Sequence, residues 1–209
     1  ILLNRDFYKL KRIYYGYPER ITKPKKDLDT DNFVFGTISR LVPQKDLPTL
    51  LKAFAEVSKE YPAARLEIAG VGYLELELKA IGDTLGINHR IDWKGKITDI
   101  DGFLFGLNAF VLTSKYEGFG LVLLEAMAAN LPIIAARNSA IPEVLGKRGG
   151  IYFETGNVES LTHEMKRVVE DQSLLSLGLS PFERLLEFSA LKMAERIIET
   201  YSEVIELAS

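Results

Sequence analysis

Residues 109–128 read AFVLTSKYEGFGLVLLEAMA and place a strand, a turn and a helix in direct succession. The opening apolar run is typical of a buried β-strand, and from Leu121 onward apolar side chains recur at helical spacing. Between them lie a carboxylate, Glu117, and two glycines, Gly118 and Gly120. Glycine lets the backbone approach a ligand closely, and the amides that open a helix have no partner within it. This turn therefore favours an oxygen-rich or anionic ligand.

The same alternation of apolar strand and helix continues through most of the chain. Short apolar runs lie at 33–38, 65–69, 91–93, 109–112, 132–135 and 151–153. Helical patterns fill the segments between and after them, with one ending near residue 60 and others at 73–85, 101–107, 121–128, 141–145 and 158–170. Strands that alternate with helices imply right-handed βαβ crossovers and a parallel sheet covered on both faces. The sequence predicts an α/β fold, a Rossmann-like parallel sheet of about six strands flanked by helices, with a C-terminal helical segment.

On this pattern the chain has three parts. Residues 1–31 are expected to be a linker or edge segment that leads from a missing N-terminal domain. Residues 32–172 are expected to form the Rossmann-like domain, and residues 173–209 to be helical. The last helix has an apolar face that consists of Ile197, Ile198, Tyr201 and Ile205. We expect this face to pack on the sheet, and the alternative is that it docks against a second domain.

Composition excludes several classes of protein. Lys and Arg number 26 and Asp and Glu 29, so the formal net charge is −3, which argues against a nucleic-acid binder with a broad basic face. The absence of cysteine removes disulfides, thiolate zinc sites and thiol nucleophiles. His89 and His163 are far apart in sequence, and no metal site is expected. The sequence has no apolar stretch long enough to span a membrane and no signal-peptide pattern, so the predicted location is cytoplasmic.

Polar and glycine-rich segments follow five of the predicted strands. In an open parallel sheet, ligands bind beyond the carboxyl ends of the strands. The segments in question contain Arg40 and Lys45, then Gly70-Val71-Gly72, then Lys94-Gly95-Lys96, then 117–120, then 137–139. Arginine holds phosphate oxygens bidentately and lysine adds a point charge, so this edge suits a ligand with phosphates and hydroxyls.

Each of these segments also has a simpler interpretation. Arg40 and Lys45 are compatible with solvated loop charges, and Glu117 with a helix cap. The glycines at 70 and 72 are not a dinucleotide fingerprint, because Glu75 occupies the place of its third glycine, and no P-loop spacing is present. An NAD-dependent dehydrogenase is therefore disfavoured.

Taken together, the segments resemble the donor-binding domain of family 4 glycosyltransferases, retaining nucleotide-sugar enzymes of GT-B architecture. Residues 36–45, GTISRLVPQK, are similar to the family's G-x-x-x-R-L-x-x-x-K segment, and residues 66–72 are similar to the glycine loop at the family's second strand. The spacing from Glu117 to Glu125 resembles the family's E-x7-E region, and 140–144 a further family segment. The resemblance extends over roughly residues 33–200 and implies one half of a GT-B fold.

The resemblance also implies roles for individual residues. Arg40 and Lys45 would hold the donor diphosphate, and Glu117 would contact the transferred sugar, so these three are the expected catalytic residues. Glu125 would accept from the ribose hydroxyls, and the segment at 95–97 would face the base. The expected donor-binding residues are Gly36, Gly70, Gly72, Gly95, Lys96, Ile97, Gly118, Phe119, Gly120, Leu121 and Glu125. No metal or other cofactor is expected. The expected partners are a nucleotide-sugar donor and an N-terminal acceptor-binding domain, and any membrane association would come through that domain.

The sequence departs from the family pattern at three places. Asn108 stands near the position where the family usually has an Asp before the fourth strand, and Asn130 replaces a Gly that is common in the family before Pro132. Both differences are expected to affect local packing. Ser139 and Ala140 replace a frequent Gly pair near the sugar, which bears on donor choice.

The predicted function is donor binding in a retaining glycosyltransferase that moves a hexose-type sugar from a nucleoside diphosphate to an acceptor. Two alternatives stay open: a GT-B enzyme of the nucleotide-sugar epimerase type, and a non-catalytic sugar-nucleotide binding or scaffold domain. The cation pair at Arg40 and Lys45, together with the two glutamates, favours the transferase.

Overall fold

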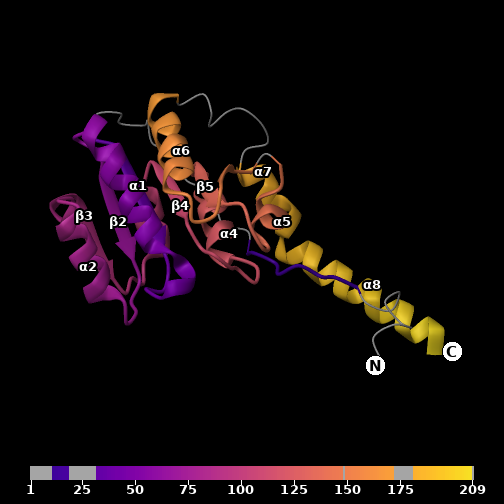
Figure 1. Cartoon of the computed structure of the whole chain (residues 1–209). Helices are drawn as coiled ribbons and strands as arrows, with labels where there is room; N and C mark the ends of the chain where they lie inside the picture. Colours follow the sequence, from indigo (N-terminus) through magenta and orange to yellow (C-terminus); the bar gives the residue numbers. More distant parts are fainter. Residues whose placement is uncertain (1–10, 19–31, 148, 172–180, 209) are drawn as a thin grey trace. The chain divides into compact units, whose positions relative to one another are not determined.

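The computed structural model describes residues 11–18, 32–147, 149–171 and 181–208. The chain divides into two compact units, Thr22–Arg184 on the one hand and Ile1–Ile21 with Leu185–Ser209 on the other. The larger unit contains a six-stranded sheet (Figure 1). All five strand pairs are parallel, which confirms the α/β prediction. The strands are β1 (Val34–Ile38), β2 (Arg65–Ala69), β3 (Ile91–Gly95), β4 (Ala109–Leu112), β5 (Ile133–Ala136) and β6 (Ile151–Phe153).

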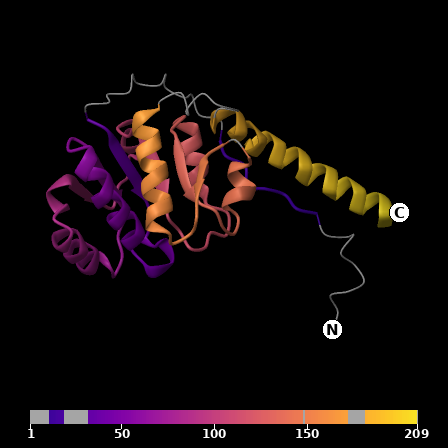
Figure 2. The same ribbon diagram turned by 45° about the horizontal axis from the view of Figure 1, so that its top comes forward.

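Helices connect these strands. They are α1 (Leu47–Glu60), α2 (Glu75–Thr84), α3 (Ile100–Phe105), α4 (Leu121–Ala128), α5 (Ile141–Leu145) and α6 (Val158–Glu170), with short 3-10 turns η2 (Pro43–Lys45) and η3 (Asn88–Arg90). Helix α1 packs between α2 and α6 in one layer (Figure 2). Its predicted apolar face is buried, with Leu50, Phe54 and Val57 fully inaccessible. Burying each such side chain stabilises the fold by about 1.5–3 kcal/mol, so this face holds α1 in place.

The order of the strands creates a switch point in the middle of the sheet. The order is β3-β2-β1-β4-β5-β6, so the chain moves outward from β1 in one direction and from β4 in the other. Right-handed crossovers of opposite direction place their helices on opposite faces, and the loops that leave β1 and β4 therefore diverge. Ligands of open α/β sheets bind in the crevice that such diverging loops leave.

Several element boundaries differ from those predicted, and three of the differences have a clear physical cause. Strand β5 begins at Ile133, because Pro132 has no N–H to donate to the ladder, although its carbonyl accepts from Phe110. Strand β3 extends to Gly95, whose carbonyl accepts a hydrogen bond from the Gly70 amide. Helix α2 begins only at Glu75, since the preceding loop is hydrogen-bonded to the backbone at Leu41.

The two asparagines that depart from the family pattern are both accommodated. Asn108 is buried. Its side-chain oxygen accepts from the backbone amide of Val34 at 2.7 Å, and its backbone amide donates to the Val34 carbonyl at 2.8 Å. Asn130 adopts a left-handed backbone with φ of 51°, a conformation that asparagine tolerates better than most residues.

The smaller unit contains the described residues 11–18 and the C-terminal residues from Leu185 onward, and residues 181–184 just before them belong to the larger unit. Helix α7 (Pro181–Leu185) leads into η5 (Leu186–Phe188) and α8 (Ala190–Ala208). Tyr17 forms a parallel bridge with Ser189, and Phe188 is buried. On α8, the predicted apolar face includes side chains that are more than half exposed, namely Ile198, Tyr201 and Ile205. Most of the predicted linker, and residues 172–180 before α7, lie outside the described residues.

No helix in the described part of the chain has both the length and the hydropathy that crossing a bilayer requires.

Candidate functional site

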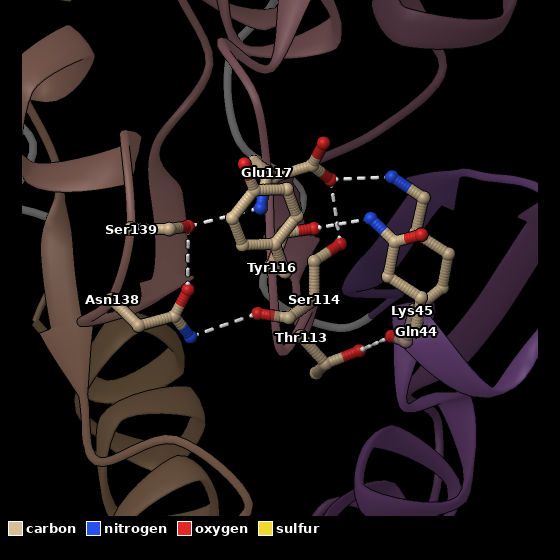
Figure 3. Close-up of polar contacts among 8 residues, drawn as sticks. All are labelled: Gln44, Lys45, Thr113, Ser114, Tyr116, Glu117, Asn138 and Ser139. Carbon is tan, nitrogen blue, oxygen red and sulfur yellow. Dashed lines mark hydrogen bonds and ion pairs between the residues drawn. The ribbon is translucent and has the colours of Figure 1, made fainter. Parts of the chain in front are cut away.

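The loops that follow β1 and β4 are joined directly across the switch point. The Lys115 amide donates to the Gln44 carbonyl at 2.8 Å, and the Gln44 side-chain amide donates to the Tyr116 carbonyl at 2.7 Å. The Thr113 hydroxyl donates to the Lys45 carbonyl at 2.8 Å. Figure 3 shows two of these contacts between the loops, Gln44 with Tyr116 and Thr113 with Lys45. Two segments that are about 70 residues apart in sequence are therefore hydrogen-bonded to each other at the carboxyl ends of β1 and β4, which is where an open α/β sheet binds its ligand.

An ion pair also joins these two loops. The ammonium of Lys45 is 2.5 Å from Oε1 of Glu117, and the Ser114 hydroxyl donates to the same oxygen at 2.7 Å. Both charged side chains are nearly buried, with exposed fractions of 13% for Lys45 and 10% for Glu117. The structure thus brings together two of the three predicted catalytic residues.

The pair keeps unused hydrogen-bonding capacity. An ammonium has three donors, and one of those on Lys45 is taken by Glu117. Oε1 of Glu117 accepts from both Lys45 and Ser114, and Figure 3 shows the second carboxylate oxygen pointing away from the other residues drawn. A ligand that offers both an anionic oxygen and a hydroxyl would find a partner on each side chain.

The other side of the Glu117 turn is held by residues that follow β5. The Glu117 amide donates to the Ser139 hydroxyl at 2.9 Å, and that hydroxyl donates to Oδ1 of Asn138 at 2.8 Å. The Asn138 side-chain amide donates to the Ser114 carbonyl at 3.0 Å and to the Thr155 hydroxyl at 2.7 Å. The sequence places Asn138 within the segment 137–139 at this edge of the sheet, but it does not single out Ser114 or Asn138 as a site residue.

The third predicted catalytic residue, Arg40, is not part of this network. Its side chain is exposed at the carboxyl end of β1 and makes no hydrogen bond or ion pair with any residue that the structure describes. An exposed cation beside the crevice is available to an anionic ligand.

At the end of β3, Lys96 is available to an anionic ligand, whereas Lys94 is already paired. Lys94 pairs with Asp92 at 2.6 Å and with Glu67 at 3.5 Å, and the hydrogen bond that its ammonium donates to Asp92 raises the pKa of Lys94 above its ordinary value. Lys94 therefore stays charged and paired with these two carboxylates. Lys96 is exposed and Ile97 half-buried at the same edge.

The predicted donor-binding glycines of the first two strands are explained by close packing. A Cβ on Gly70, whose φ is +134°, would lie 1.8 Å from the Ser39 carbonyl oxygen. A Cβ on Gly72 would lie 2.3 Å from the Leu41 carbonyl oxygen. The loop after β2 therefore lies against the backbone that carries Arg40. Gly36 is inside β1, where a Cβ would meet the buried side chain of Leu107 at 2.4 Å. A contact of these glycines with a donor stays a prediction.

The turn before α4 is open to solvent. Gly120 has a φ of 80° and caps α4 without a side-chain hydrogen bond. Gly118 is exposed with free space where a Cβ would stand, Leu121 is 54% exposed, and Phe119 is half-buried. Glu125 lies half-buried in the second turn of α4. The first amides of α4 therefore face an accessible turn beside the ion pair.

Comparison with known proteins places this geometry in a family. Residues 19–177, more than half of the chain, match the family described as glycosyl transferases group 1. The chain is 29% identical over 196 residues to an uncharacterized glycosyltransferase of Methanocaldococcus jannaschii, covering 91% of this chain and 48% of that protein. It is also 29% identical to a GDP-mannose-dependent phosphatidylinositol monomannoside mannosyltransferase of Corynebacterium glutamicum, covering 78% of this chain and 45% of that enzyme. The chain thus spans about half the length of these curated relatives.

Solved structures show the same fold. The chain aligns with a variant of Staphylococcus aureus TarM, crystallised with UDP among other ligands, at a TM-score of 0.76 and 22% identity, covering 87% of this chain and 38% of TarM. It aligns with Anabaena HepE in complex with UDP-glucose at a TM-score of 0.73 and 25% identity, covering 82% of this chain and 49% of HepE. The chain therefore belongs to the group 1 glycosyl transferases, family 4, and corresponds to the C-terminal half of their GT-B architecture.

Proposed function

We propose that this chain binds the nucleotide-sugar donor in a retaining glycosyltransferase that moves a hexose-type sugar from a nucleoside diphosphate to an acceptor. The observation that carries the proposal is the contact of Lys45 with Glu117 across the switch point. It places a cation and a carboxylate side by side where an open α/β sheet binds its ligand. A nucleotide sugar offers a diphosphate next to sugar hydroxyls, which is the matching chemistry.

The cations act on the leaving group. As the glycosidic bond breaks, negative charge grows on the diphosphate, and preorganised cations stabilise that charge. Lys45 keeps donors available beyond its contact with Glu117, so it can hold a phosphate oxygen and the carboxylate at once. Arg40, exposed on the same loop, would add a bidentate contact. These two residues do this work without a metal.

Glu117 acts on the sugar. Its second carboxylate oxygen would accept a hydrogen bond from a sugar hydroxyl, and the amides of residues 118–121 would orient the ring. The acceptor would then attack from the face that the diphosphate leaves, the front-face route expected of the family. Glu125 would accept from the ribose, and the segment at 95–97 would face the base.

The relatives support a nucleotide sugar as the ligand. The Corynebacterium enzyme is named as GDP-mannose-dependent, and the HepE structure contains UDP-glucose. Transfer requires the acceptor to be held against the donor. Because this chain spans about half of its relatives, we expect it to bind the donor alone but to transfer little or no sugar.

Thermal unfolding with nucleotides tests the proposal. The chain is heated with UDP, GDP and ADP, and with UDP-glucose, GDP-mannose and ADP-glucose, in the absence of added metal. A ligand at a hundred times its dissociation constant stabilises the folded state by about 2.7 kcal/mol. We expect one base to raise the melting temperature, and Arg40→Ala to remove most of the shift.

A matched control is Arg65→Ala, which removes the same charge from the opposite, amino-terminal edge of the sheet. It should leave the nucleotide-dependent shift intact. The absence of a shift with all six compounds, or an undiminished shift in Arg40→Ala, would contradict the proposed function.

A further inference from the structure

Ser139 has a backbone conformation that serine rarely adopts. It follows β5 with a φ of 44°, in the left-handed region that favours glycine. Non-glycine residues in this region store strain and persist only where surrounding contacts hold them. Serine in place of glycine here therefore needs a contact that compensates for the strain.

The compensating contact is with the Glu117 turn. The Ser139 hydroxyl accepts a hydrogen bond from the Glu117 amide at 2.9 Å and donates one to the Asn138 side chain at 2.8 Å. Asn138 in turn reaches both the Ser114 carbonyl and the Thr155 hydroxyl. The loop after β5 thus links the loop after β4 to the loop after β6. Figure 3 shows its contacts with the loop after β4.

Glu117 is consequently fixed from two sides. Lys45 and Ser114 hold its carboxylate through Oε1, and Ser139 holds its backbone amide. With the amide occupied, Glu117 meets a ligand as an acceptor only, through its second carboxylate oxygen. The recognised group must then be a donor such as a sugar hydroxyl.

We propose that Ser139 and Asn138 are positioning residues, which hold the Glu117 turn so that its carboxylate meets a hydroxyl of the donor sugar. This inference rests on the proposed function, because it concerns the sugar half of the same site. It assigns no contact with the diphosphate to either residue. A change at Ser139 should therefore affect recognition of the sugar and leave recognition of the nucleoside diphosphate unchanged.

The experiment compares the two ligand classes in Ser139→Gly. Calorimetric titrations use UDP and UDP-glucose, GDP and GDP-mannose, and ADP and ADP-glucose. Glycine relieves the left-handed strain but also removes the two hydrogen bonds of the Ser139 hydroxyl, so the two effects oppose each other and the melting temperature should change little. Affinity for the diphosphate that binds should be unchanged. Affinity for its sugar conjugate should fall about threefold to tenfold, the range expected for one lost hydrogen bond.

Asn130→Gly is the matched control. Asn130 has an equivalent left-handed φ of 51° at the end of α4, and glycine relieves it in the same way. Both affinities should stay at their wild-type values in this variant. Amide hydrogen exchange adds a measurement without ligand: the Glu117 amide should exchange about threefold to tenfold faster in Ser139→Gly and at the wild-type rate in Asn130→Gly.

The outcomes separate the two proposals. If the wild-type chain binds a nucleotide sugar and Ser139→Gly binds it equally well, the positioning role is overturned and the proposed function stands. If Ser139→Gly loses diphosphate and sugar-conjugate affinity equally, the residue is merely structural and the inference is again overturned. If the wild-type chain binds none of the six compounds, the proposed function fails and the positioning role fails with it.

Discussion

Lys45→Ala is expected to lower the free energy of unfolding and to weaken nucleoside diphosphate binding at the same time. The Lys45 side chain is 13% exposed and neutralises a Glu117 carboxylate that is 10% exposed. Removing one partner of such a pair leaves an uncompensated, nearly buried charge, which typically costs about 3–5 kcal/mol. Loss of a charged hydrogen bond to phosphate should weaken binding about tenfold or more. Urea unfolding and calorimetric titration measure the two effects.

Two further variants separate stability from binding. Lys59→Ala removes a lysine whose pairing with Glu56 is exposed and lies at the far end of α1, so it should cost at most about 1 kcal/mol and leave binding intact. The double variant Lys45→Ala with Glu117→Ala removes both charges, and we expect it to regain stability relative to Lys45→Ala but not diphosphate affinity. Wild-type diphosphate affinity in Lys45→Ala would refute the assigned role.

Glu117→Gln is expected to weaken binding of the nucleotide sugar and not of the nucleoside diphosphate, whereas Lys45→Ala weakens binding of the diphosphate itself. The substitution keeps the size of the side chain and an oxygen that accepts from Lys45, but removes the charge that would receive a sugar hydroxyl. Hydrogen bonds to charged groups contribute about 1.5–3 kcal/mol, so affinity for the nucleotide sugar should fall about tenfold to a hundredfold. Affinity for the diphosphate alone should not fall. Calorimetric titration of both compounds measures the difference.

Glu56→Gln provides the control for this variant, because it removes an exposed carboxylate from α1, away from the crevice. Equal loss of diphosphate and nucleotide-sugar affinity in Glu117→Gln would show that the carboxylate supports the fold of the site and does not contact the sugar.

The arrangement of the sheet is predictable from this sequence because parallel strands are buried on both faces. Strands β4 and β5 are fully buried, and each is a continuous apolar run in the sequence. The start of α2 is not predictable in this way. Its helical pattern extends back to Tyr73, but hydrogen bonds from the loop after β2 to Leu41, which is about 30 residues earlier, hold that loop out of the helix.

The site is predictable only as a set of loops. The chain order places Arg40, Lys45 and Glu117 at one edge of the sheet, because carboxyl ends of parallel strands share an edge. It does not reveal that Lys45 contacts Glu117 and that Arg40 stays apart, since those contacts depend on side-chain directions across the switch point. The support from Ser139 is less predictable still, because a left-handed serine has no signature in its own sequence.

Mapping of a bound nucleotide onto the chain tests the central claim most directly. In the 23.5 kDa chain, backbone amide resonances are followed by NMR during titration with the nucleoside diphosphate that stabilises it. We predict that the shifted amides gather in the loops after β1, β2, β3 and β4, at residues 39–46, 70–72, 95–97 and 117–121. A nucleotide that binds but shifts only residues at the amino-terminal edge of the sheet, or on α6, would contradict the account.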